Sequence, residues 1–246
     1  MAVIVGHLDI VAPDETWFDV RGAATGYLAA VAFRGWPDEA IDFFDRLEVD
    51  NSKSYWQEHK DVYDRCVKAR MEELLGEMAG EFGAGKVFRP YRDVRFSKDK
   101  APYKTNIAAT TANGGYVSLS AAGLAAGAGM YMMATDQLER YRRAVASEAQ
   151  GGALEQIAAA LEKQGHECTP HGALKTAPRG YPRDHPRIDL LRAKGLTAWH
   201  QWEPGPWLST AKAKTRVVSL LRASEPLKEW LGEHVGDSSL PEPGRR

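Results

Sequence analysis

The sequence predicts an α+β protein in which a mainly antiparallel sheet is flanked by helices within a single domain. Apolar residues recur at helical spacing near residues 38–78 and again over residues 136–164 and 186–234. Between the first two regions, short strand-like runs follow one another, with Asn113-Gly114-Gly115 as a hairpin turn. With 246 residues, 43% of them hydrophobic, the chain is long enough to bury a sizeable core.

The first helix is expected to open at Pro37-Asp38-Glu39, because proline and acidic residues favour a helix N-terminus. Asp50-Asn51-Ser52 ends it, and one longer helix then follows from about Tyr55 to Met78. Glycines at positions 80, 83 and 85 end this second helix.

Residues 86–97 alternate like a strand, with Arg89, Tyr91, Asp93 and Arg95 on its charged face. Pro90 suggests an edge position or a bulge, and residues 99–102 form a turn. The remaining elements are expected as strands at 103–112, 115–121, 125–133 and near 197–203; helices from a cap at Asp136 to about 149, over 152–164, and near 186–194, 209–222 and 226–234; and a loop over 171–186.

The two ends of the chain lack this patterning. Residues 1–32 are interpreted as an N-terminal extension outside the domain, which spans 33–235, and residues 236–246 as a disordered tail rich in Gly, Ser and Pro. Two cysteines make no disulfide framework, and the sequence has neither a signal-peptide pattern nor an apolar stretch of about 18 residues. We therefore expect a cytoplasmic protein with no membrane partner.

Positive charge is concentrated in two blocks, although the formal net charge is only −1. Residues 86–104 hold seven basic and two acidic residues, a local excess of +5, and residues 175–194 hold six basic and two acidic residues, an excess of +4. This distribution favours a focused anion site over a general basic surface.

The first block contains the motif Arg89-x-x-Arg92-Asp93-x-Arg95-Phe96-x-x-Asp99-Lys100-x-x-Tyr103. In this motif the chain resembles a bacterial family catalogued as domain of unknown function 2461, whose signature is R-x-x-R-D-x-R-F-x-x-[DN]-K-x-x-Y. The resemblance extends from about Phe33 to Val235 and implies that residues 1–32 lie outside the common domain. It implies no particular reaction.

The leading hypothesis is a site for an anionic, phosphate-containing ligand, because Arg binds phosphate oxygens bidentately and Lys adds point charge. Its expected contacts are Arg89, Arg92, Arg95, Lys98, Lys100 and Lys104, joined in one cavity by Lys175 or Arg179 from the second block. Asp93, Asp99 and Tyr103 are the catalytic candidates. The two aspartates would be orienting groups or, as less favoured alternatives, metal ligands or acid/base groups, and Tyr103 would donate a hydrogen bond.

Several alternatives stay open at this point. The protein could act on phosphate esters or on nucleic acid. The sequence, however, contains no complete set of catalytic residues, and no cofactor can be predicted from it. The alternative from a different class is a non-catalytic interaction module in which the Arg/Asp motif is a structural ion-pair network.

Other motifs have weaker functional interpretations. His166, Cys168 and His171 lack a second cluster at zinc-site spacing, so no metal is predicted. His59 falls on an apolar helical stripe and is expected to pack there. Glycines 123, 127 and 129 are expected to mark bulges or close packing within a sheet. A second group is expected mainly to pack, although it could also stack a base or a sugar: Trp199, Trp202 and Trp207.

Overall fold

The computed structural model describes residues 32–95 and 97–240. The predicted extension, apart from Ala32, therefore lies outside the described residues, as do Phe96 and the last six residues of the predicted tail. The boundaries of the extension and the tail remain predictions.

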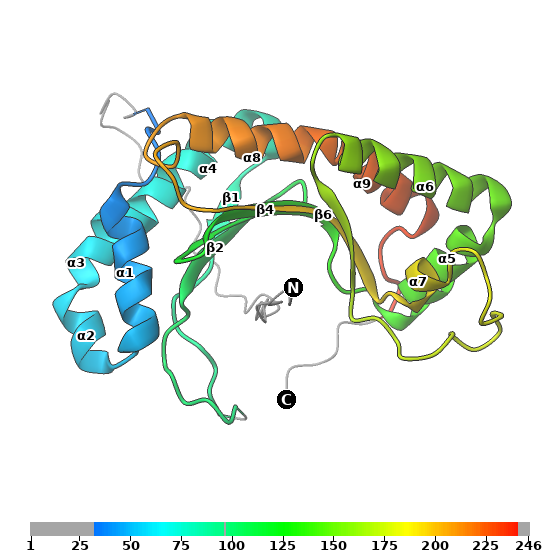
Figure 1. Cartoon of the computed structure of the whole chain (residues 1–246), viewed down its shortest axis with the longest axis horizontal. Coiled ribbons are helices and arrows are strands. Elements are labelled where there is room, and N and C mark those ends of the chain that lie inside the picture. Colours follow the sequence, from blue (N-terminus) through cyan, green and yellow to red (C-terminus); the bar gives the residue numbers. More distant parts are fainter. Residues whose placement is uncertain (1–31, 96, 241–246) are drawn as a thin grey trace. The chain divides into compact units, whose positions relative to one another are not determined.

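A six-stranded sheet with the order β1-β2-β3-β4-β6-β5 is the centre of the fold, and all its neighbouring strands pair antiparallel (Figure 1). The predicted α+β class is thus confirmed. The strands are β1 (Gly85–Val87), β2 (Asn106–Thr111), β3 (Gly115–Ser120), β4 (Gly123–Met130), β5 (Glu167–His171) and β6 (Gly195–Trp202).

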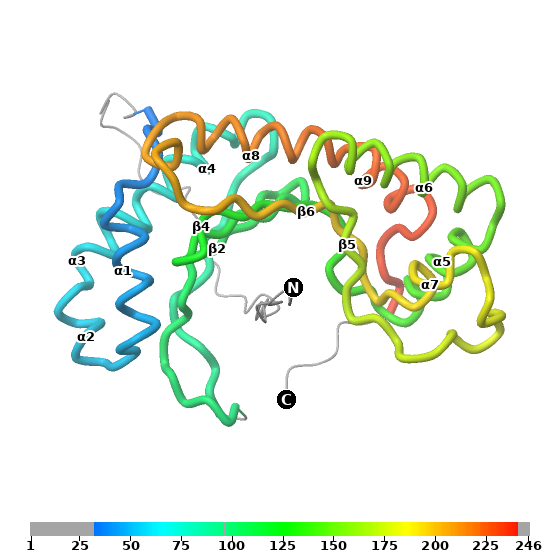
Figure 2. Tube along the Cα trace, viewed as in Figure 1, coloured from blue at the N-terminus to red at the C-terminus, as the bar shows by residue number. Residues whose placement is uncertain are grey.

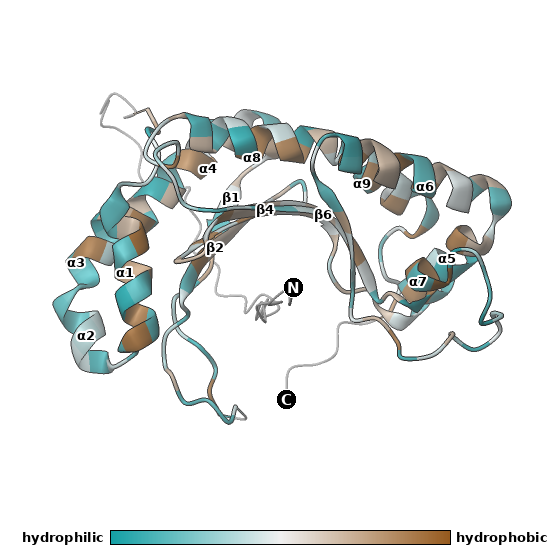
Figure 3. Ribbon diagram, in the orientation of Figure 1, coloured by the Kyte–Doolittle hydropathy of each residue, from teal (hydrophilic) through white to brown (hydrophobic). Residues whose placement is uncertain are grey.

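Helices precede, interrupt and follow this sheet in the chain. They are α1 (Asp38–Val49), α2 (Lys53–Glu58), α3 (Lys60–Val62), the π-helix η1 (Tyr63–Lys68), α4 (Ala69–Phe82), α5 (Thr135–Ala146), α6 (Glu148–Lys163), α7 (Ile188–Arg192), α8 (Lys212–Ala223) and α9 (Glu225–His234). Hydrophobic and hydrophilic residues alternate along the longer helices, as expected of amphipathic helices that cover a core (Figure 3).

The two faces of the sheet have different surroundings. Helices α4, α8 and α9 pack on one face, where Ile107, Val117 and Leu124 are buried (Figure 1). Side chains alternate between faces along each strand, so Asn106, Tyr116 and the intervening positions of β4 and β6 belong to the opposite face. Among the described helices, none lies beneath the centre of that opposite face in Figure 1. We call it the second face of the sheet, and Ser118 and Thr197 on it are buried.

Two expectations about local structure were wrong, and one strand was not expected. The single helix predicted after Tyr55 is interrupted at His59, where the backbone leaves helical geometry, and the π-helical turn that follows shifts the side-chain register. The strand predicted over residues 86–97 ends at Val87, because Pro90 offers no N–H to continue the ladder. The predicted loop over 171–186 follows a strand, β5, that the sequence pattern did not reveal.

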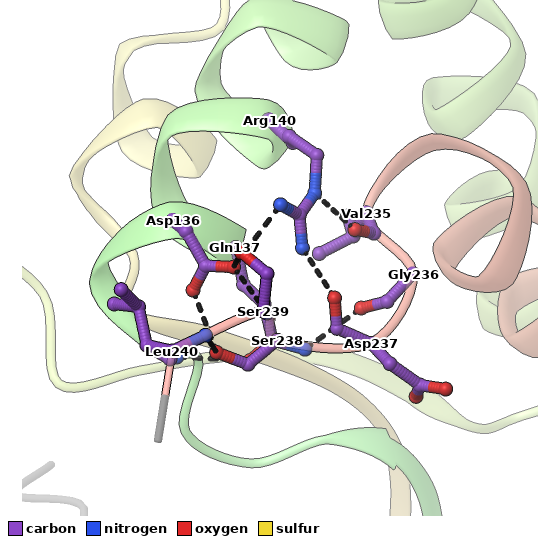
Figure 4. Close-up of polar contacts among 10 residues, drawn as sticks. Asp136, Gln137, Arg140, Val235, Gly236, Asp237, Ser238, Ser239 and Leu240 are labelled. Carbon is purple, nitrogen blue, oxygen red and sulfur yellow. Dashed lines mark hydrogen bonds and ion pairs between the residues drawn. The ribbon is translucent and has the colours of Figure 1, made fainter. Parts of the chain in front are cut away.

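A group of polar contacts fastens the residues after α9 to the first turns of α5 (Figure 4). The Asp136 carboxylate accepts hydrogen bonds from Ser239 N and Ser238 Oγ, both at 2.8 Å, and from Arg140 Nη1 at 3.1 Å. Arg140 also donates to Asp237 O at 2.6 Å. Asp136 was predicted to cap α5, but Ala134 is the N-cap residue and Asp136 instead secures residues 236–240.

Candidate functional site

The signature residues lie on a long β-hairpin that continues β1 and β2 beyond the sheet, which we call the signature hairpin (residues 88–105). Its two arms are joined by backbone hydrogen bonds from Phe88 N to Ala108 O (2.8 Å), Lys104 N to Pro90 O (2.7 Å) and Arg92 N to Pro102 O (2.9 Å). The prolines interrupt regular pairing. The motif therefore occupies the arms and tip of one hairpin, and does not form a single charged strand face.

The hairpin is attached to the N-terminal helices through Tyr103. Its side chain is buried, and its ring stacks on Trp56 at 4.2 Å between centroids and an interplanar angle of 7°. Asn51 holds the backbone of the same residue, accepting from Tyr103 N at 3.0 Å and donating to Tyr103 O at 3.1 Å. Burial, followed by the neighbouring Tyr91, raises the pKa of Tyr103. Packing thus gives Tyr103 a structural role, and its place among the catalytic candidates stays a prediction.

Charged residues at the hairpin tip contact one another. Arg95 forms a bidentate pair with Asp93, with Nη2 to Oδ2 at 2.7 Å and Nε to Oδ1 at 3.0 Å. These hydrogen bonds lower the pKa of Asp93 to about 2. Arg92 forms an ion pair with Asp99 across the tip, and this contact lowers the pKa of the Asp99 carboxyl. The candidate orienting groups therefore orient arginines of the same hairpin.

Two further lysines belong to the tip. Lys100 donates from Nζ to the Val94 carbonyl oxygen at 3.0 Å, and Lys98 is exposed. The Lys100 contact closes the turn from one arm to the other, as an architectural role would require.

A further group of residues, two of them basic, lies where the hairpin leaves the sheet. We call this group the hairpin base (Phe88, Arg89 and Lys104). Lys104 is half-buried, with Nζ 5.7 Å from the centroid of the Phe88 ring. Within residues 32–95 and 97–240, no carboxylate forms an ion pair with it. Burial and, to a lesser extent, the Arg89 cation lower the pKa of Lys104. Lys104 and Arg89 thus influence each other where the hairpin leaves the sheet.

The second basic block lies at the other edge of the sheet. Lys175 and Arg179 are exposed in the connection after β5, whereas the hairpin extends from β1 and β2 (Figures 1 and 2). Five strand spacings separate β1 from β5, or about 24 Å at ~4.8 Å each. The sheet order therefore gives no support to a shared cavity, and the prediction that both blocks line one cavity stays a prediction.

One arginine of the second block has a structural role that the sequence did not indicate. The Arg187 side chain is buried, and it forms ion pairs with Glu155 at 3.0 Å and Glu148 at 3.2 Å. Its Nη1 also donates to the Val145 carbonyl oxygen at 3.4 Å. Arg187 thereby secures the start of α7 to the corner between α5 and α6.

The second face of the sheet carries polar and aromatic residues, of which the sequence analysis had singled out Trp199. Tyr116 on β3 has its pKa raised by burial, an effect partly offset by hydrogen bonds with Ser118 and then Asn106. Its ring lies 5.8 Å from that of Trp199 on β6. Alternation of polar with apolar residues in β3 and β6 was the available signal, since Tyr116, Ser118, Thr197 and Trp199 all fall on this face.

The structure gives ordinary surroundings to two of the weaker motifs, the segment from His166 to His171 and His59. No group of three metal-ligating side chains occurs within the described part of the chain. His166 faces His200 with 3.5 Å between their Nδ1 atoms, whereas His171 Nε2 lies 2.7 Å from Thr197 Oγ1, so the two histidines of the motif have different partners. His59 stacks on Tyr55 at 4.1 Å, which confirms its packing role.

The fold and the hairpin define an α+β protein whose signature residues extend from an antiparallel sheet and are fastened to a helical subassembly. The family model described as "Conserved hypothetical protein (DUF2461)" matches residues 39–230, and the chain belongs to this family. Comparison with curated proteins and with solved structures gives no significant match. No helix in the described residues is long and apolar enough to cross a membrane.

Proposed function

We propose that this protein binds a phosphate-containing anion at the hairpin base, with Arg89 and Lys104 as the principal contacts. The supporting observation is Lys104, which is half-buried against the Phe88 ring and forms no ion pair with a carboxylate of the described residues. Burial disfavours the charged form of a lysine, and an anion bound beside Lys104 favours it again.

The other predicted contacts take supporting parts in this proposal. Arg92, Arg95 and Lys100 keep the tip folded, and Lys98 adds exposed charge there. Asp93 and Asp99 act as orienting groups. Lys175 and Arg179 follow β5, at the far edge of the sheet, and have no part in this proposal. A cytoplasmic location remains part of the proposal, and both cysteines are free thiols.

The rival proposal is an interaction module in which the signature is architectural. Its support comes from the tip, where Arg92–Asp99 and Arg95–Asp93 bring carboxylates and guanidinium groups of the same hairpin together. On this view the hairpin presents a fixed shape to another protein, and phosphate binding plays no part.

The two proposals predict different behaviour of the Lys104→Met variant. If the hairpin base binds an anion, pyrophosphate titrated into the full chain should bind, and Lys104→Met or Arg89→Met should weaken that binding at least tenfold. The Lys104 variant should also be as stable as the parent in urea, because a desolvated cation has been removed. Lys212→Met, at an exposed lysine of α8, is the matched control.

The opposite pattern supports the rival. Pyrophosphate binding that is absent, or is equal in the parent, Lys104→Met and Lys212→Met proteins, contradicts an anion site at the hairpin base. A loss of stability in Arg92→Met, whose side chain is mostly covered at the tip, without any change in anion binding, is what an architectural network predicts.

A further inference from the structure

A cavity of about 130 Å³ lies among the N-terminal helices α1, α2 and α3. The residues that line it include Glu39, Asp42, Phe43, Arg46, Tyr55 and His59. A larger cavity, of about 320 Å³, lies between α6 and the junction of α8 with α9. It is lined by alanine, isoleucine, proline and glutamine and offers no charged group to orient a ligand. The smaller cavity, by contrast, combines apolar walls with a few polar groups, as small-molecule sites do.

Aromatic rings held by hydrogen bonds form the walls of the smaller cavity. The Tyr55 and His59 rings stack at 4.1 Å between centroids and an interplanar angle of 19°. The Tyr55 hydroxyl donates to the Phe43 carbonyl oxygen at 3.3 Å, and His59 Nδ1 lies 2.9 Å from the Tyr55 carbonyl oxygen. Because Nδ1 must donate to that oxygen, Nε2 of the neutral His59 ring is an acceptor, and it has no hydrogen-bond partner in the described residues. The walls are thus fixed before any ligand binds.

Charged side chains of both signs line the same cavity. Glu39, Asp42 and Arg46 are exposed and follow one another on α1 at spacings of three and four residues. Side chains at such spacings are about 5–6 Å apart at their Cβ atoms and often form ion pairs. Within the described residues, however, Arg46 forms no ion pair with Asp42 or with Glu39. These opposite charges therefore remain available to a ligand, and their exposure makes the cavity accessible from solvent.

Arg46 also lies near the ring wall. Burial raises the pKa of Tyr55, and the Arg46 cation partly offsets this rise. A guanidinium beside an aromatic wall can bind a carboxylate through two parallel N–H donors. The carboxylates of Glu39 and Asp42 accept hydrogen bonds from an ammonium group in the same way.

These groups match the charges of one small molecule. Because cation and carboxylate are separated by about one helical turn, a ligand that satisfies both must carry two opposite charges close together. A cavity of ~150 Å³ holds a molecule the size of benzene. The observed cavity therefore has room for the charged part of such a ligand and for a small side chain.

We infer that this cavity binds a free α-amino acid, whose ammonium group contacts Asp42 and Glu39 and whose carboxylate contacts Arg46. An apolar side chain is favoured, because aromatic rings form the remaining walls. A peptide is a poorer match, since its two charged termini are far apart. This site is additional to the proposed anion site at the hairpin base and does not depend on it.

Isothermal titration calorimetry of the full chain with L-valine and two analogues tests the inference. Isobutylamine lacks the carboxylate of valine, and isovalerate lacks its ammonium group. Valine should bind at least tenfold more tightly than either analogue, because the loss of a hydrogen bond between charged groups weakens binding roughly 10- to 150-fold.

Two variants assign each charge of the ligand to a side chain. Arg46→Met should weaken valine binding at least tenfold without weakening the binding of isobutylamine. Asp42→Asn should weaken the binding of both. Arg65→Met and Asp45→Asn, at exposed positions that do not line the cavity, are the matched controls and should bind valine as the parent does. Thermal unfolding verifies that all four variants fold.

The outcomes separate this inference from the proposed function. Absence of valine binding, or equal binding by the parent and Arg46→Met, overturns the inference. Isobutylamine that binds as tightly as valine also overturns it, because the cavity would then select an amine alone. The hairpin base is judged separately with pyrophosphate, which Arg46→Met should bind as the parent does. An equal loss of pyrophosphate and valine binding in Arg46→Met would contradict a separate site at α1.

Discussion

Two adjacent glycines near the start of α6 provide a sharp test of how the second basic block is secured. Gly151 is buried, and a Cβ there would overlap the Val145 carbonyl oxygen and lie 2.9 Å from Arg187 Nε. Gly152, one residue later, has no atom within 4 Å of the same position. Gly151→Ala and Gly152→Ala therefore make the same chemical change in the same helix, with and without a steric conflict.

The expected free energies follow from these surroundings. Alanine favours a helix over glycine by roughly 0.5–1 kcal/mol, so Gly152→Ala should be more stable than the parent protein. Gly151→Ala gains the same amount but adds an overpacking cost of about 1–3 kcal/mol. The upper end is expected, because the Val145 oxygen belongs to the backbone and cannot rotate away. The propensity gain cancels in the comparison, so the two variants should differ by about 1–3 kcal/mol.

Urea unfolding followed by tryptophan fluorescence measures this difference, with unchanged m-values as the check that both variants unfold alike. In thermal unfolding the separation should be about 2–12 °C, at about 2–4 °C per kcal/mol for a chain of this size. Equal stability of the two variants, or a more stable Gly151→Ala, would refute the close approach of α6, Val145 and Arg187.

Two further predictions concern titratable groups. Hydrogen bonds from Ser239 N–H, and then from Ser238 and Arg140, hold the pKa of Asp136 well below its usual range. Their stabilising effect is therefore full above the unfolded pKa of about 4 and is lost as pH falls through the lower folded value. The Asp136→Asn variant should therefore show a smaller change in melting temperature between neutral and acidic pH than the parent does. An equal change in variant and parent would contradict the contact. Burial raises the pKa of the Cys168 thiol to about 11. Iodoacetamide at neutral pH should therefore modify this thiol slowly in the folded protein and faster after unfolding in urea. Equal rates in the folded and unfolded protein would show that the thiol is accessible.

Local sequence patterns were sufficient for the fold class and for much of the element order. The apolar spacing of Phe43, Phe44 and Leu47 predicted α1, and the Asn113-Gly114 turn predicted the hairpin between β2 and β3. Such signals succeed because the periods of helices and strands are set by neighbours within a few residues. The signature likewise identified the family before any coordinates, since eight spaced residue identities are a property of the chain alone.

The candidate site depended on contacts between residues distant in sequence. Strand order placed the two basic blocks at opposite edges of the sheet, although both are equally basic when read along the chain. Tyr103 is a candidate catalytic residue in the sequence, but in the structure its ring stacks on Trp56. Trp199 and Trp202 look alike in the sequence, but the pleat of β6 places their side chains on opposite faces of the sheet. The sequence by itself determined which elements form and which family the chain belongs to. Tertiary structure decided which charges meet and which rings stay outside the core, because strand order and long-range packing arise only when the whole chain folds.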